Sequence, residues 1–456
     1  MTGSELAGKR VLVIGLGVSG FSAAKALVEL DAKVRVTEGG ASEAILDRAQ
    51  HLRALGAEVE IGGHDLDRLD ADLAVISPGI PPSSPVASAV RSEGIELWSE
   101  VELAYRLARC DFLAITGTNG KTTTTTLLAR ILEEAGTPTA AAGNIGYPLI
   151  DAIASVPASG AIALEVSSFQ LAATERFKPR SAVLLNIAED HTDWHGSFES
   201  YRDAKARLIA NQDGDDVFLP NLADANAMQI ASSARSSVVP FSAHGLPDGG
   251  IGRRGADIVW RDQVVLEVDD VPLPGHTGLE DAIAAAGAAL EYGIGHQAVA
   301  RAIRGFRPLA HRLEVVAEQG GITYIDDSKA TNPHATLAAL RGMKDVVLIA
   351  GGRSKGIDLG PLVAAAPSLV AVIALGEARS ELEKLFENVV PVEVVDSMDE
   401  AVRAAARRSI SPGSVLLSPA CASLDMYESY VARGEDFARA VGKLLKERKE
   451  GSDGVA

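Results

Sequence analysis

The sequence has few residues of several kinds, and each shortage argues against a class of protein. Its 456 residues include two cysteines, Cys110 and Cys421, so neither a disulfide framework nor a cysteine-based metal site is expected. Aromatic residues make up only 4% of the chain. Basic residues are outnumbered by acidic ones, 43 to 61, which gives a net charge of −18. This charge argues against wrapping of nucleic acid and against binding to an anionic membrane surface.

Long apolar runs are also missing. No stretch of about 18 residues is free of both glycine and charge, so no segment is expected to span a membrane. Met1–Lys9 has no long apolar core behind a basic region, so a signal peptide is not expected either. The apolar content of 47% and the charged content of 23% are ordinary for an α/β protein. We therefore predict a cytoplasmic protein, whose length suggests about three domains.

The most informative segment is Ile115–Thr123, which reads ITGTNGKTT. An apolar strand pattern, Asp111–Ile115, precedes it, and a helical pattern, Thr124–Ala135, follows it. A strand, a glycine-rich turn and a helix N-terminus together form a phosphate cradle. A strict Walker A motif would have its first glycine at Ile115, so the match to that motif is incomplete. The alternative is a plain glycine turn with a surface lysine, but the strand and helix on either side favour the cradle.

The residue types within this loop suit an ATP site. Backbone N–H groups and the helix dipole face the phosphates, and Lys121 adds a positive charge. A hydroxyl at Thr122 or Thr123 can hold a magnesium ion bound to the same phosphates. The predicted ATP-binding residues of the loop are Gly117, Thr118, Asn119, Gly120, Lys121, Thr122 and Thr123.

A second glycine-rich turn lies near the N-terminus. The strand pattern Arg10–Ile14 is followed by Gly15–Gly20, which reads GLGVSG, and a second strand pattern, Lys33–Thr37, ends at Glu38. This is the dinucleotide fingerprint, with glycines for close phosphate approach and an acidic residue for a ribose. Taken alone it favours an NAD site. The pattern specifies a diphosphate at a helix N-terminus, however, and not the nucleotide that carries it.

Polar residues end three further strand patterns. Ser77–Gly79 follows Leu73–Ile76, at the sheet edge where open α/β sheets bind ligands, although a plain turn is the alternative. Glu165 and His191 follow two strands of the central segment. Hard ligands at neighbouring strand ends on the phosphate-loop side suit magnesium. The alternative is a solvated Glu165 and a His191 that is hydrogen-bonded to Asp190.

The C-terminal third has its own strand and helix alternation. A hairpin pattern, Val315–Ile325, precedes three strand–helix units between residues 346 and 417, which predicts a third domain with a parallel sheet. Polar turns that share one edge of a sheet favour a ligand site over unrelated turns. The turns at its strand ends are Asp326–Pro333, Gly351–Gly356 and Ser418–Asp425.

Together these motifs resemble the Mur ligases of peptidoglycan synthesis over nearly the whole chain. The most specific segments are Thr116–Thr123, Leu164–Gln170, Asn186–His191, Asp327–Asn332 and Leu417–Asp425. The first three match any Mur ligase, whereas Gly15–Gly20 and the run SPACASLD resemble the branch that adds D-glutamate. The resemblance implies three α/β domains: a Rossmann-like domain at 1–97, a P-loop ATPase-like domain with a parallel sheet at 98–306, and a Rossmann-like domain at 307–456.

The resemblance also implies the reaction. D-Glutamate would be joined to UDP-N-acetylmuramoyl-L-alanine by an amide bond, through an acyl phosphate, with ATP and two Mg²⁺ ions. These small molecules are the expected partners, with no nucleic acid and no membrane insertion, and we expect a monomer. A different Mur ligase or folylpolyglutamate synthase is the alternative within the fold. An NAD-linked oxidoreductase or a nucleotide-sensing module would leave the ATP loop and the third domain unexplained.

Substrate-binding roles follow from the resemblance where residues match. The residues implied at the UDP-substrate are Val18, Ser19, Glu38, Ser77, Pro78, Gly79, Asn144 and Ser167. Those implied at D-glutamate are Thr331, Lys355, Ser423, Leu424 and Tyr430. Those implied at ATP, besides the loop, are Asp281, Arg312, Asp327 and Lys329. The chain departs from the family at Gly39–Gly40, where Thr-Arg is frequent, and at Gly278 and Asp281, which replace two asparagines.

Metal and catalytic roles are implied in the same way. Thr122 and Glu165 would hold one Mg²⁺ ion, and His191 the second, with Lys121 at the phosphates. Lys205 matches a lysine that family members carry as a carbamate, which is an anionic oxygen ligand for magnesium. Its helical context alone would instead indicate a solvated surface charge. The implied catalytic residues are thus Lys121, His191 and Lys205.

Overall fold

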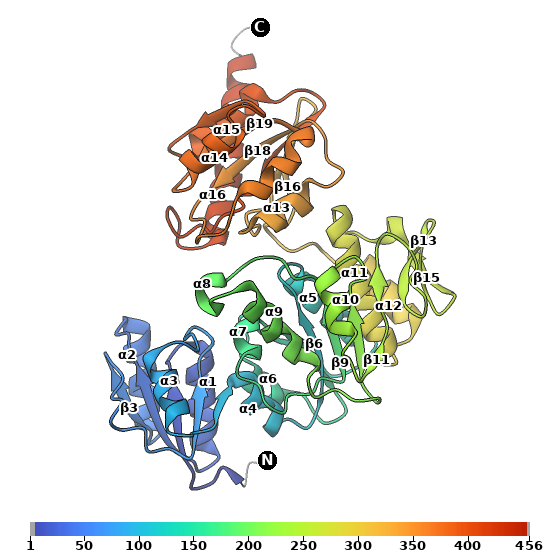
Figure 1. Ribbon diagram of the computed structural model, residues 1–456. Helices are drawn as coiled ribbons and strands as arrows, with labels where there is room; N and C mark the ends of the chain where they lie inside the picture. The colour runs from blue at the N-terminus through green and yellow to red at the C-terminus, as the bar shows by residue number, and fades with distance from the viewer. Residues whose placement is uncertain (1–4, 454–456) are drawn as a thin grey trace. The chain divides into compact units, whose positions relative to one another are not determined.

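The computed structural model describes residues 5–453, and the side chains of residues 5–448 (Figure 1). Residues 1–4 lie outside this range. They begin the segment Met1–Lys9, in which the sequence shows no signal-peptide pattern. The chain forms two compact units. The first comprises the residues up to Ile187, Trp194–Val271 and Glu280–Phe306, and the second comprises Ala188–Asp193, Pro272–Leu279 and the residues from Arg307 on. Among the described helices, none has the length and apolar character needed to cross a membrane.

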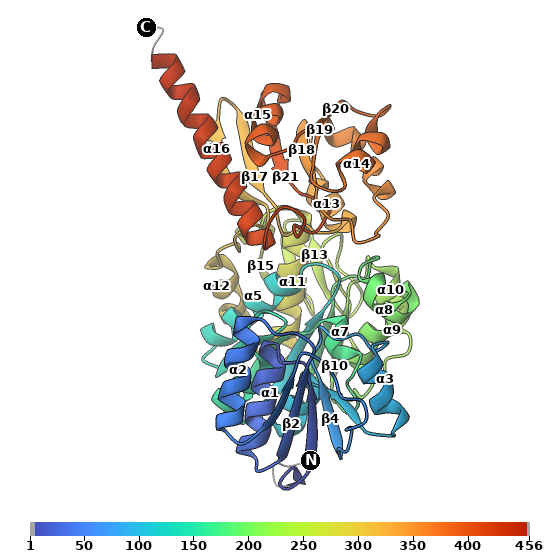
Figure 2. The same ribbon diagram turned by 90° about the vertical axis from the view of Figure 1, so that its left-hand side faces the viewer.

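The N-terminal part of the first unit is a parallel sheet with strand order β3-β2-β1-β4-β5. Val11 and Val13 of β1 belong to the core formed with α1 and α2, whereas Leu12 and Ile14 face α3 (Figure 2). Helices on both faces of an open parallel sheet make this a Rossmann-like arrangement. Its elements are β1 (Arg10–Ile14), α1 (Val18–Glu29), β2 (Lys33–Glu38), α2 (Glu43–Ala54), β3 (Glu58–Ile61), β4 (Leu73–Ile76), α3 (Pro85–Ser92) and β5 (Leu97–Ser99).

The sequence pattern of Trp98–Arg109 predicts a helix, but the helix starts later, at α4 (Glu100–Leu107). Trp98 lies in β5 and pairs with β4. Ser99 accepts a hydrogen bond from the backbone N–H of Glu102 at 3.3 Å and thereby caps the helix. The sequence prediction was wrong here because a strand of three residues leaves no periodic signal.

The central part of the first unit is a second parallel sheet, with strand order β11-β10-β9-β6-β8-β7. Strand β6 lies between β8 and β9 and leads into the predicted ATP loop. Helix α5 starts at Lys121 rather than at Thr124, directly after Gly120 in the left-handed conformation. The elements are β6 (Asp111–Thr116), α5 (Lys121–Glu134), β7 (Thr139–Gly143), α6 (Leu149–Ser155), β8 (Ala161–Glu165), α7 (Ser168–Leu171), β9 (Ser181–Leu184), α8 (Thr192–His195), α9 (Phe198–Ala206), η2 (Arg207–Ile209), β10 (Val217–Pro220), α10 (Ala225–Ala231) and β11 (Ser237–Val238).

Residues 241–267 contribute a small sheet with order β12-β13-β14-β15, within the segment 211–275 whose strands cannot be ordered from the sequence. The sequence pattern over Asp257–Val268 predicts a hairpin, and this is confirmed, since β14 and β15 pair antiparallel. Helices are predicted after it at Leu279–Tyr292 and Gln297–Gly305, and both are present with shifted ends. The elements are β12 (Phe241–Ser242), β13 (Ile251–Arg254), β14 (Asp257–Trp260), β15 (Gln263–Glu267), η3 (Val268–Asp270), α11 (Gly275–Glu291) and α12 (His296–Arg304).

The second unit is built on a sheet with order β16-β17-β21-β18-β19-β20, in which only the β16–β17 hairpin is antiparallel. One face packs against α15 and α16, and the other against α13, α14 and η4 (Figures 1 and 2). The elements are β16 (Glu314–Gln319), β17 (Ile322–Asp326), α13 (Pro333–Leu340), β18 (Val346–Gly351), η4 (Gly360–Ser368), β19 (Leu369–Leu375), α14 (Arg379–Phe386), β20 (Val392–Val394), α15 (Met398–Arg408), β21 (Gly413–Leu417) and α16 (Tyr430–Asp453).

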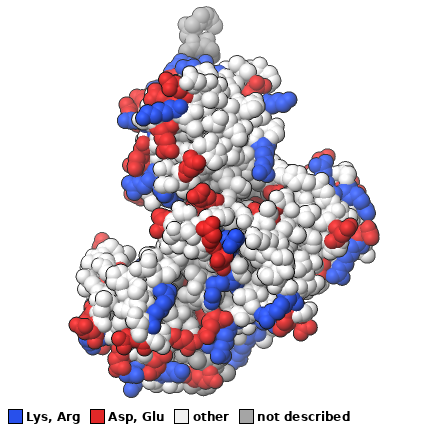
Figure 3. All heavy atoms as spheres, viewed as in Figure 1, with Lys and Arg blue, Asp and Glu red and all other residues white. Residues whose placement is uncertain are grey.

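Charges of both signs are mixed on the surface. On the face drawn in Figure 3, acidic and basic side chains lie interspersed over each unit. Many of them pair, as Arg403 does with Glu447 at 3.0 Å and Arg304 with Asp270 at 2.7 Å. Such exposed pairs contribute about 0–1 kcal/mol each, so they affect solubility more than stability.

Candidate active site

The predicted ATP loop is held from one side by Asn186, which follows β9. Its Oδ1 accepts hydrogen bonds from the backbone N–H groups of Thr118 at 3.1 Å and Asn119 at 2.8 Å. Its Nδ2 donates to the carbonyl of Asn119 at 3.2 Å. The sequence placed Asn186 in a family motif but gave it no role. Its position after a strand adjacent to β6 was the available signal.

The loop is closed from another side by Asp281 of α11. Gly120 has φ +85°, and a Cβ there would lie 2.3 Å from Oδ1 of Asp281. The buried Asp281 also accepts a hydrogen bond from Thr124 Oγ1 at 3.2 Å. Both the positive φ and the lack of space for a Cβ therefore favour glycine at position 120. Asp281 supports the phosphate loop, and its predicted contact with adenosine stays a prediction.

Two lysines meet at the carbonyl of Gly117. Lys121 Nζ donates to it at 2.9 Å and to the carbonyl of Thr118 at 2.8 Å. Lys205 Nζ donates to the same Gly117 oxygen at 2.8 Å and lies 4.7 Å from the ring centre of Tyr201. Lys205 is only 2% exposed. The solvated position that its helical context indicated is therefore wrong, because the helix turns this side chain towards the loop.

Tyr201 is a second residue of this cluster that sequence reasoning missed. It is almost fully buried, and its hydroxyl lies 2.9 Å from Thr118 Oγ1. Lys205, one turn later on α9, stands on the same helical face. The i, i+4 spacing of Tyr201 and Lys205 was visible in the sequence, but a period alone does not say which face points to the loop.

Glu165 ends β8 next to the loop, since it pairs in register with Ile115 of β6. It is 2% exposed, and its Oε1 accepts a hydrogen bond from Asn144 Nδ2 at 2.7 Å. Its Oε2 is buried and has no hydrogen-bond partner within the described part of the chain. A buried carboxylate oxygen without a donor is unfavourable unless a cation or ligand completes it. The structure thus brings Asn144 and Glu165 together.

Ser167, predicted at the UDP-substrate, caps helix α7. Its side chain accepts from the backbone N–H of Gln170 at 3.2 Å, and Gln170 Oε1 accepts from the backbone N–H of Ser167 at 3.0 Å. This capping box fixes the turn after Glu165. The Ser167 side chain is buried beside the strand end, and its substrate contact stays a prediction.

The N-terminal glycine turn is held by two predicted substrate residues. Glu38 accepts hydrogen bonds from the backbone N–H groups of Leu16 and Gly40, both at 2.6 Å. Ser77 Oγ donates to the carbonyl of Gly15 at 3.3 Å. Gly17, the N-cap of α1, makes no side-chain cap, and Val18 after it is 51% exposed. The turn thus leads into a helix N-terminus, and Glu38 and Ser77 hold its backbone through hydrogen bonds.

Of the two glycines at the departure Gly39–Gly40, Gly40 has tight surroundings. A Cβ at Gly40 would lie 3.2 Å from Oε1 of Glu38 and 3.1 Å from Ile45 Cδ1. A side chain at position 40 would therefore crowd the carboxylate that holds the turn. Pro78 and Gly79 continue the turn after β4, at the same sheet edge as Gly15.

His191 belongs to the short segment Ala188–Asp193, which clusters with the second unit. Its backbone is left-handed, with φ +55°, and its N–H donates to Asp190 Oδ1 at 2.9 Å. The buried Asp190 also accepts from Asn332 Nδ2 at 3.1 Å. The structure therefore groups His191 with the second unit, and Glu165, Lys121 and Lys205 with the first.

In the second unit, Asp327 lies at the end of β17. It is buried and accepts hydrogen bonds from Ser418 Oγ at 2.8 Å and from the backbone N–H of Leu313 at 3.4 Å. Burial raises the pKa of Asp327 to about 7, although the Ser418 hydroxyl and the Arg312 charge lower it. A carboxyl that titrates near neutral pH marks this strand end as a candidate site.

Other predicted residues of this unit gather around Tyr430. Lys329 Nζ lies 3.9 Å from the centre of the Tyr430 ring, a cation–π contact. The His311 ring lies 6.2 Å from that of Tyr430, and His311 Nδ1 is 2.7 Å from Asp326 Oδ2. Lys329 and Tyr430, assigned to different ligands by the resemblance, are therefore neighbours.

Arg433 of α16 is the main residue of this unit that sequence reasoning missed. It is 2% exposed, and its guanidinium donates to the Ser328 hydroxyl at 3.0 Å and to the carbonyls of Ser328 at 2.8 Å and Cys421 at 3.0 Å. Its Nη1 also lies 3.5 Å from the carbonyl of Gly351. One side chain thus connects all three polar turns. An arginine in an amphipathic helix pattern gives no sign of such burial.

The remaining predicted D-glutamate residues lie in or near these turns. Thr331 and Lys355 are partly exposed, and Lys355 has a left-handed backbone with φ +57°. Ser423 is buried, whereas Leu424 is 58% exposed. The turns follow β17, β18 and β21, which are neighbours in the sheet. The sheet therefore brings these residues to one edge.

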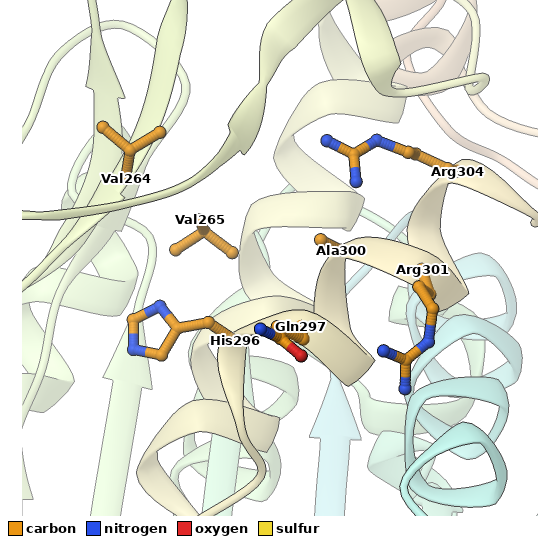
Figure 4. A pocket seen from close by; sticks show the side chains of 7 residues that line it. All are labelled: Val264, Val265, His296, Gln297, Ala300, Arg301 and Arg304. Carbon is orange, nitrogen blue, oxygen red and sulfur yellow. The ribbon is translucent and has the colours of Figure 1, made fainter.

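A separate hollow lies between β15 and α12, away from all predicted site residues. Figure 4 shows Val264, Val265 and His296 around one space, with Arg301 and Arg304 on the helix side. Arg301 pairs with Glu134 at 2.9 Å, and Arg304 pairs with Asp270. Both guanidinium groups already have carboxylate partners, so nothing here points to an anion.

Comparison with known proteins gives a family for each part of the chain. Residues 9–99 match the Mur ligase MurD-like, N-terminal domain, residues 115–289 the Mur ligase middle domain, and residues 311–421 the Mur ligase, glutamate ligase domain. The chain belongs to the Mur ligase family. The resemblance seen in the sequence and the α/β fold with three Mur ligase domains are thereby confirmed. The domain limits 97/98 and 306/307 and the roles of individual residues stay predictions.

Relatives and solved structures agree with this assignment. A UDP-N-acetylmuramoylalanine--D-glutamate ligase of Frankia casuarinae is 42% identical over 453 residues, covering 96% of this chain and 95% of that protein. A ligase of the same name from Caldanaerobacter subterraneus is 38% identical over 449 residues, covering 97% of this chain and 100% of that protein. The family catalyses ATP-dependent amide ligation, so the expected ligase class holds for this Mur ligase.

Two solved structures share its fold. A pseudomurein peptide ligase type C of Methanothermus fervidus has a TM-score of 0.60 at 17% identity and covers 96% of this chain and 100% of its own. UDP-N-acetylmuramate-alanine ligase MurC of Thermotoga maritima has a TM-score of 0.58 at 18% identity, with 95% and 99% covered. At these identities the likeness concerns the fold alone.

Proposed function

We propose that this Mur ligase joins D-glutamate to UDP-N-acetylmuramoyl-L-alanine and converts ATP to ADP and phosphate. The observation that carries the proposal is the similarity, over nearly the full length, to ligases named for this reaction, at 42% identity in the Frankia protein. The run SPACASLD and the MurD-like N-terminal domain support it. The ATP loop with Lys121, Lys205 and Glu165 supplies the chemistry that such a reaction needs.

The reaction has two steps. The carboxylate of the L-alanyl group attacks the γ-phosphate of ATP, which forms an acyl phosphate and releases ADP. The amine of D-glutamate then attacks the acyl carbon, loses a proton and expels phosphate. Because two anions meet in the first step, charge neutralisation and in-line positioning dominate catalysis. The loop N–H groups and Lys121 provide both at the γ-phosphate.

The residues present fit magnesium, which we propose as two ions. Thr122 and Glu165 would hold one, since Glu165 Oε2 is buried and has no partner among the described residues. His191 is proposed at the second ion, and a carbamylated Lys205 is proposed as a further oxygen ligand for magnesium. Bound Mg²⁺ would neutralise phosphate and carboxylate oxygens. Asn144 keeps Glu165 oriented through Oε1, which leaves Oε2 for the cation.

The carbamate on Lys205 has a physical argument of its own. Lys121 and Lys205 both donate to the Gly117 carbonyl, so two ammonium groups lie close together, that of Lys121 partly exposed and that of Lys205 buried. Like charges at such a distance disfavour each other. Addition of CO₂ to the neutral amine of Lys205, with loss of a proton, replaces one cation by an anion. The change removes the repulsion and creates an oxygen ligand.

The polar turns of the second unit would hold D-glutamate and the nucleotide. Lys355 is proposed to pair with a carboxylate of D-glutamate, and Ser423 and Thr331 to supply hydroxyls. Leu424 and Tyr430 would complete the pocket. Arg312, Asp327 and Lys329 are proposed at ATP. We also propose that the protein is a monomer, which light scattering tests, and that it is cytoplasmic, which cell fractionation tests.

Phosphate release tests the proposal directly. Purified full-length protein with ATP and Mg²⁺ should release phosphate only when UDP-N-acetylmuramoyl-L-alanine and D-glutamate are both present. Replacement of D-glutamate by L-glutamate, L-alanine or a diamino acid should abolish turnover. Preference for another amino acid, or for a folate substrate, would contradict the proposal. Absorbance change of a nicotinamide cofactor without ATP would favour an oxidoreductase instead.

A further inference from the structure

The chain around Ala188–Asp193 has two anchors, each at the start of a helix. On one side, the backbone N–H of Ile187 donates to Asp224 Oδ2 at 3.0 Å, and Asp224 is the N-cap of α10. On the other side, Asp190 Oδ2 accepts from Asn332 Nδ2 at 3.1 Å, and Asn332 is the N-cap of α13. Helix α10 belongs to the first unit and α13 to the second. The chain therefore passes from one unit to the other between Ile187 and Asp190.

The side-chain amide of Asn332 uses both of its polar groups. Its Oδ1 accepts the backbone N–H of Ala335 at 2.9 Å, which caps α13. This bond leaves Nδ2 directed at Asp190. Asn332 is 2% exposed and Asp190 is 6% exposed. A hydrogen bond to a carboxylate is among the stronger ones, and here the loss of one partner would deprive the other of a bond in a place with little water.

The carboxyl group of Asp190 also holds the backbone of His191. Its Oδ1 accepts the His191 N–H at 2.9 Å and lies 3.6 Å from His191 Nδ1. His191 has φ +55°, a left-handed conformation that residues other than glycine adopt seldom, and which persists where the surroundings impose it. A carboxyl group whose other oxygen is bound by Asn332 is such a constraint. Asn332 thus acts on the backbone from which the His191 side chain extends.

We propose that Asn332 is a positioning residue for the reaction, which through Asp190 holds His191 in place for the proposed magnesium site. This inference rests on the proposed function, in which His191 lies at the second ion. Asn332 directly follows Thr331, which is proposed at D-glutamate. The turn that would carry the amino acid therefore also holds the residue that would serve the ion. The second unit would then contribute to the metal-dependent step besides binding the amino acid.

Helix capping alone is the simpler explanation for a buried asparagine at this position, and it makes a different demand on the side chain. A cap needs only an oxygen that accepts the N–H of Ala335, and aspartate caps helices as well as asparagine does. The bond to Asp190 needs in addition an N–H donor, which the amide of Asn332 has and a carboxylate lacks. The substitution Asn332→Asp therefore separates the two roles.

Asn332→Asp keeps the capping oxygen and places a carboxylate oxygen opposite Asp190, so that repulsion replaces the bond. Hydrogen exchange of the His191 amide, followed by mass spectrometry on the full-length protein without ligands, should become about tenfold faster. In phosphate release, kcat should fall about tenfold, and the Mg²⁺ concentration for half-maximal rate should rise about tenfold. The KM for UDP-N-acetylmuramoyl-L-alanine should stay within about threefold, because the residues proposed at that substrate are not changed.

An exchange of the two side chains gives the rescue. Asp190→Asn alone puts an NH₂ group opposite either Asn332 Nδ2 or the His191 N–H, so amide exchange should again be about tenfold faster. Together with Asn332→Asp it restores one donor and one acceptor and keeps an oxygen for each backbone N–H. Exchange in this double variant should return to within about threefold of wild type. Asn388→Asp, at an exposed asparagine of the same unit, adds the same charge as Asn332→Asp and should change neither exchange nor kinetics.

Unchanged exchange of the His191 amide in Asn332→Asp would overturn the inference, and so would a double variant that exchanges as fast as the single variants. Fast exchange with an unchanged Mg²⁺ requirement would reduce Asn332 to a structural role and contradict the positioning. If Asn332→Asp does not fold, the comparison of Asp190→Asn with the double variant decides. Exchange needs no substrate, so a wild type that releases no phosphate contradicts the proposed function and leaves the exchange comparison valid.

Discussion

At the scale of single residues, the phosphate loop is organised by side chains that contact its backbone. Asn186 binds the N–H groups of Thr118 and Asn119, and Lys121 and Lys205 bind the Gly117 carbonyl. Lys121 is partly exposed, whereas Lys205 is buried. Substitution of the two lysines should therefore have different structural consequences, even though both should stop the reaction.

Lys121→Ala should lower kcat at least about 100-fold at saturating ATP, because it removes a charge that acts where phosphate charge develops. Its folding should be nearly unchanged, since the partly exposed side chain donates to carbonyls of its own loop. ADP formation and a circular dichroism melt measure the two effects. Near-normal turnover in a folded variant would contradict the proposed role of Lys121 at the ATP phosphates.

Lys205→Ala should lose activity, and bicarbonate or short carboxylic acids should partly restore it by placing an anion in the vacated space. The variant should also be less stable, because a buried side chain that contacts Tyr201 and Gly117 is removed. Titration of phosphate release against acetate or formate gives the measurement, with Lys25→Ala, an exposed lysine, as the control. Full activity of untreated Lys205→Ala would exclude the carbamate.

The raised pKa of Asp327 predicts how the stability of the second unit depends on pH. Its folded pKa of about 7 lies above the ordinary value of 3.8, so the protonated form stabilises the folded state. This stabilisation is complete below about pH 4 and is lost as the pH rises through 7. Asp327→Asn should therefore weaken the fall in stability of the second unit between pH 5 and pH 7.5. Urea midpoints from circular dichroism at both pH values check it, and an unchanged pH dependence would contradict the buried state of Asp327.

At the scale of elements, the recurring arrangement is a strand that ends in a polar turn supported by a neighbouring element. Strand β6 and α5 form the ATP loop, which Asp281 of α11 closes. In the second unit, α16 supports the turns after β17, β18 and β21 through Arg433. The supporting residues are distant in sequence from the turns that they hold, so the geometry of the turns depends on the packing of the helices.

Arg433→Met should destabilise the second unit by about 2–4 kcal/mol, because it leaves buried carbonyls of Ser328 and Cys421 without donors. The KM for D-glutamate should rise, since the turns that carry its proposed site lose their common partner. Chemical denaturation and steady-state kinetics measure both effects. Arg439→Ala, on the exposed face of the same helix, should change stability by less than about 0.5 kcal/mol. Equal effects of the two changes would argue against the role of Arg433.

At the scale of the whole molecule, the candidate residues are distributed over two units, with the ATP loop in one and the predicted D-glutamate turns in the other. An acyl phosphate is hydrolysed easily, so the proposed reaction requires exclusion of water once all substrates are bound. If three substrates are held by different parts of one chain, as proposed, turnover should require all of them.

Removal of divalent metal should abolish phosphate release without unfolding the chain. Of the proposed ligands, Glu165 ends β8, Thr122 lies in the first turn of α5, His191 directly precedes α8 and Lys205 lies in the last turn of α9, and the backbone hydrogen bonds of these elements do not need the ion. Activity after chelation and return of Mg²⁺, followed beside a far-UV spectrum, gives the test. Full activity in excess chelator would contradict the proposed metal sites.

The sequence alone determined the positions of the main strands and the polar turns that follow them. Strands β1 and β4 have the limits that were predicted, because buried parallel strands are short, apolar and bounded by glycine or polar residues. Short edge strands such as β5 and β20 were missed. They contribute few apolar residues, and their pairing partners are distant along the chain.

What only the tertiary structure decided is which side chains face the turns. Lys205 and Arg433 lie in helical patterns that indicate exposure, yet both are buried. Glu100, at the start of α4, is buried as well. The phosphate loop was recognisable because its chemistry is local: a strand, a glycine turn and a helix N-terminus adjoin in sequence. Burial of a charge depends on elements that meet through long-range packing, which no local pattern records.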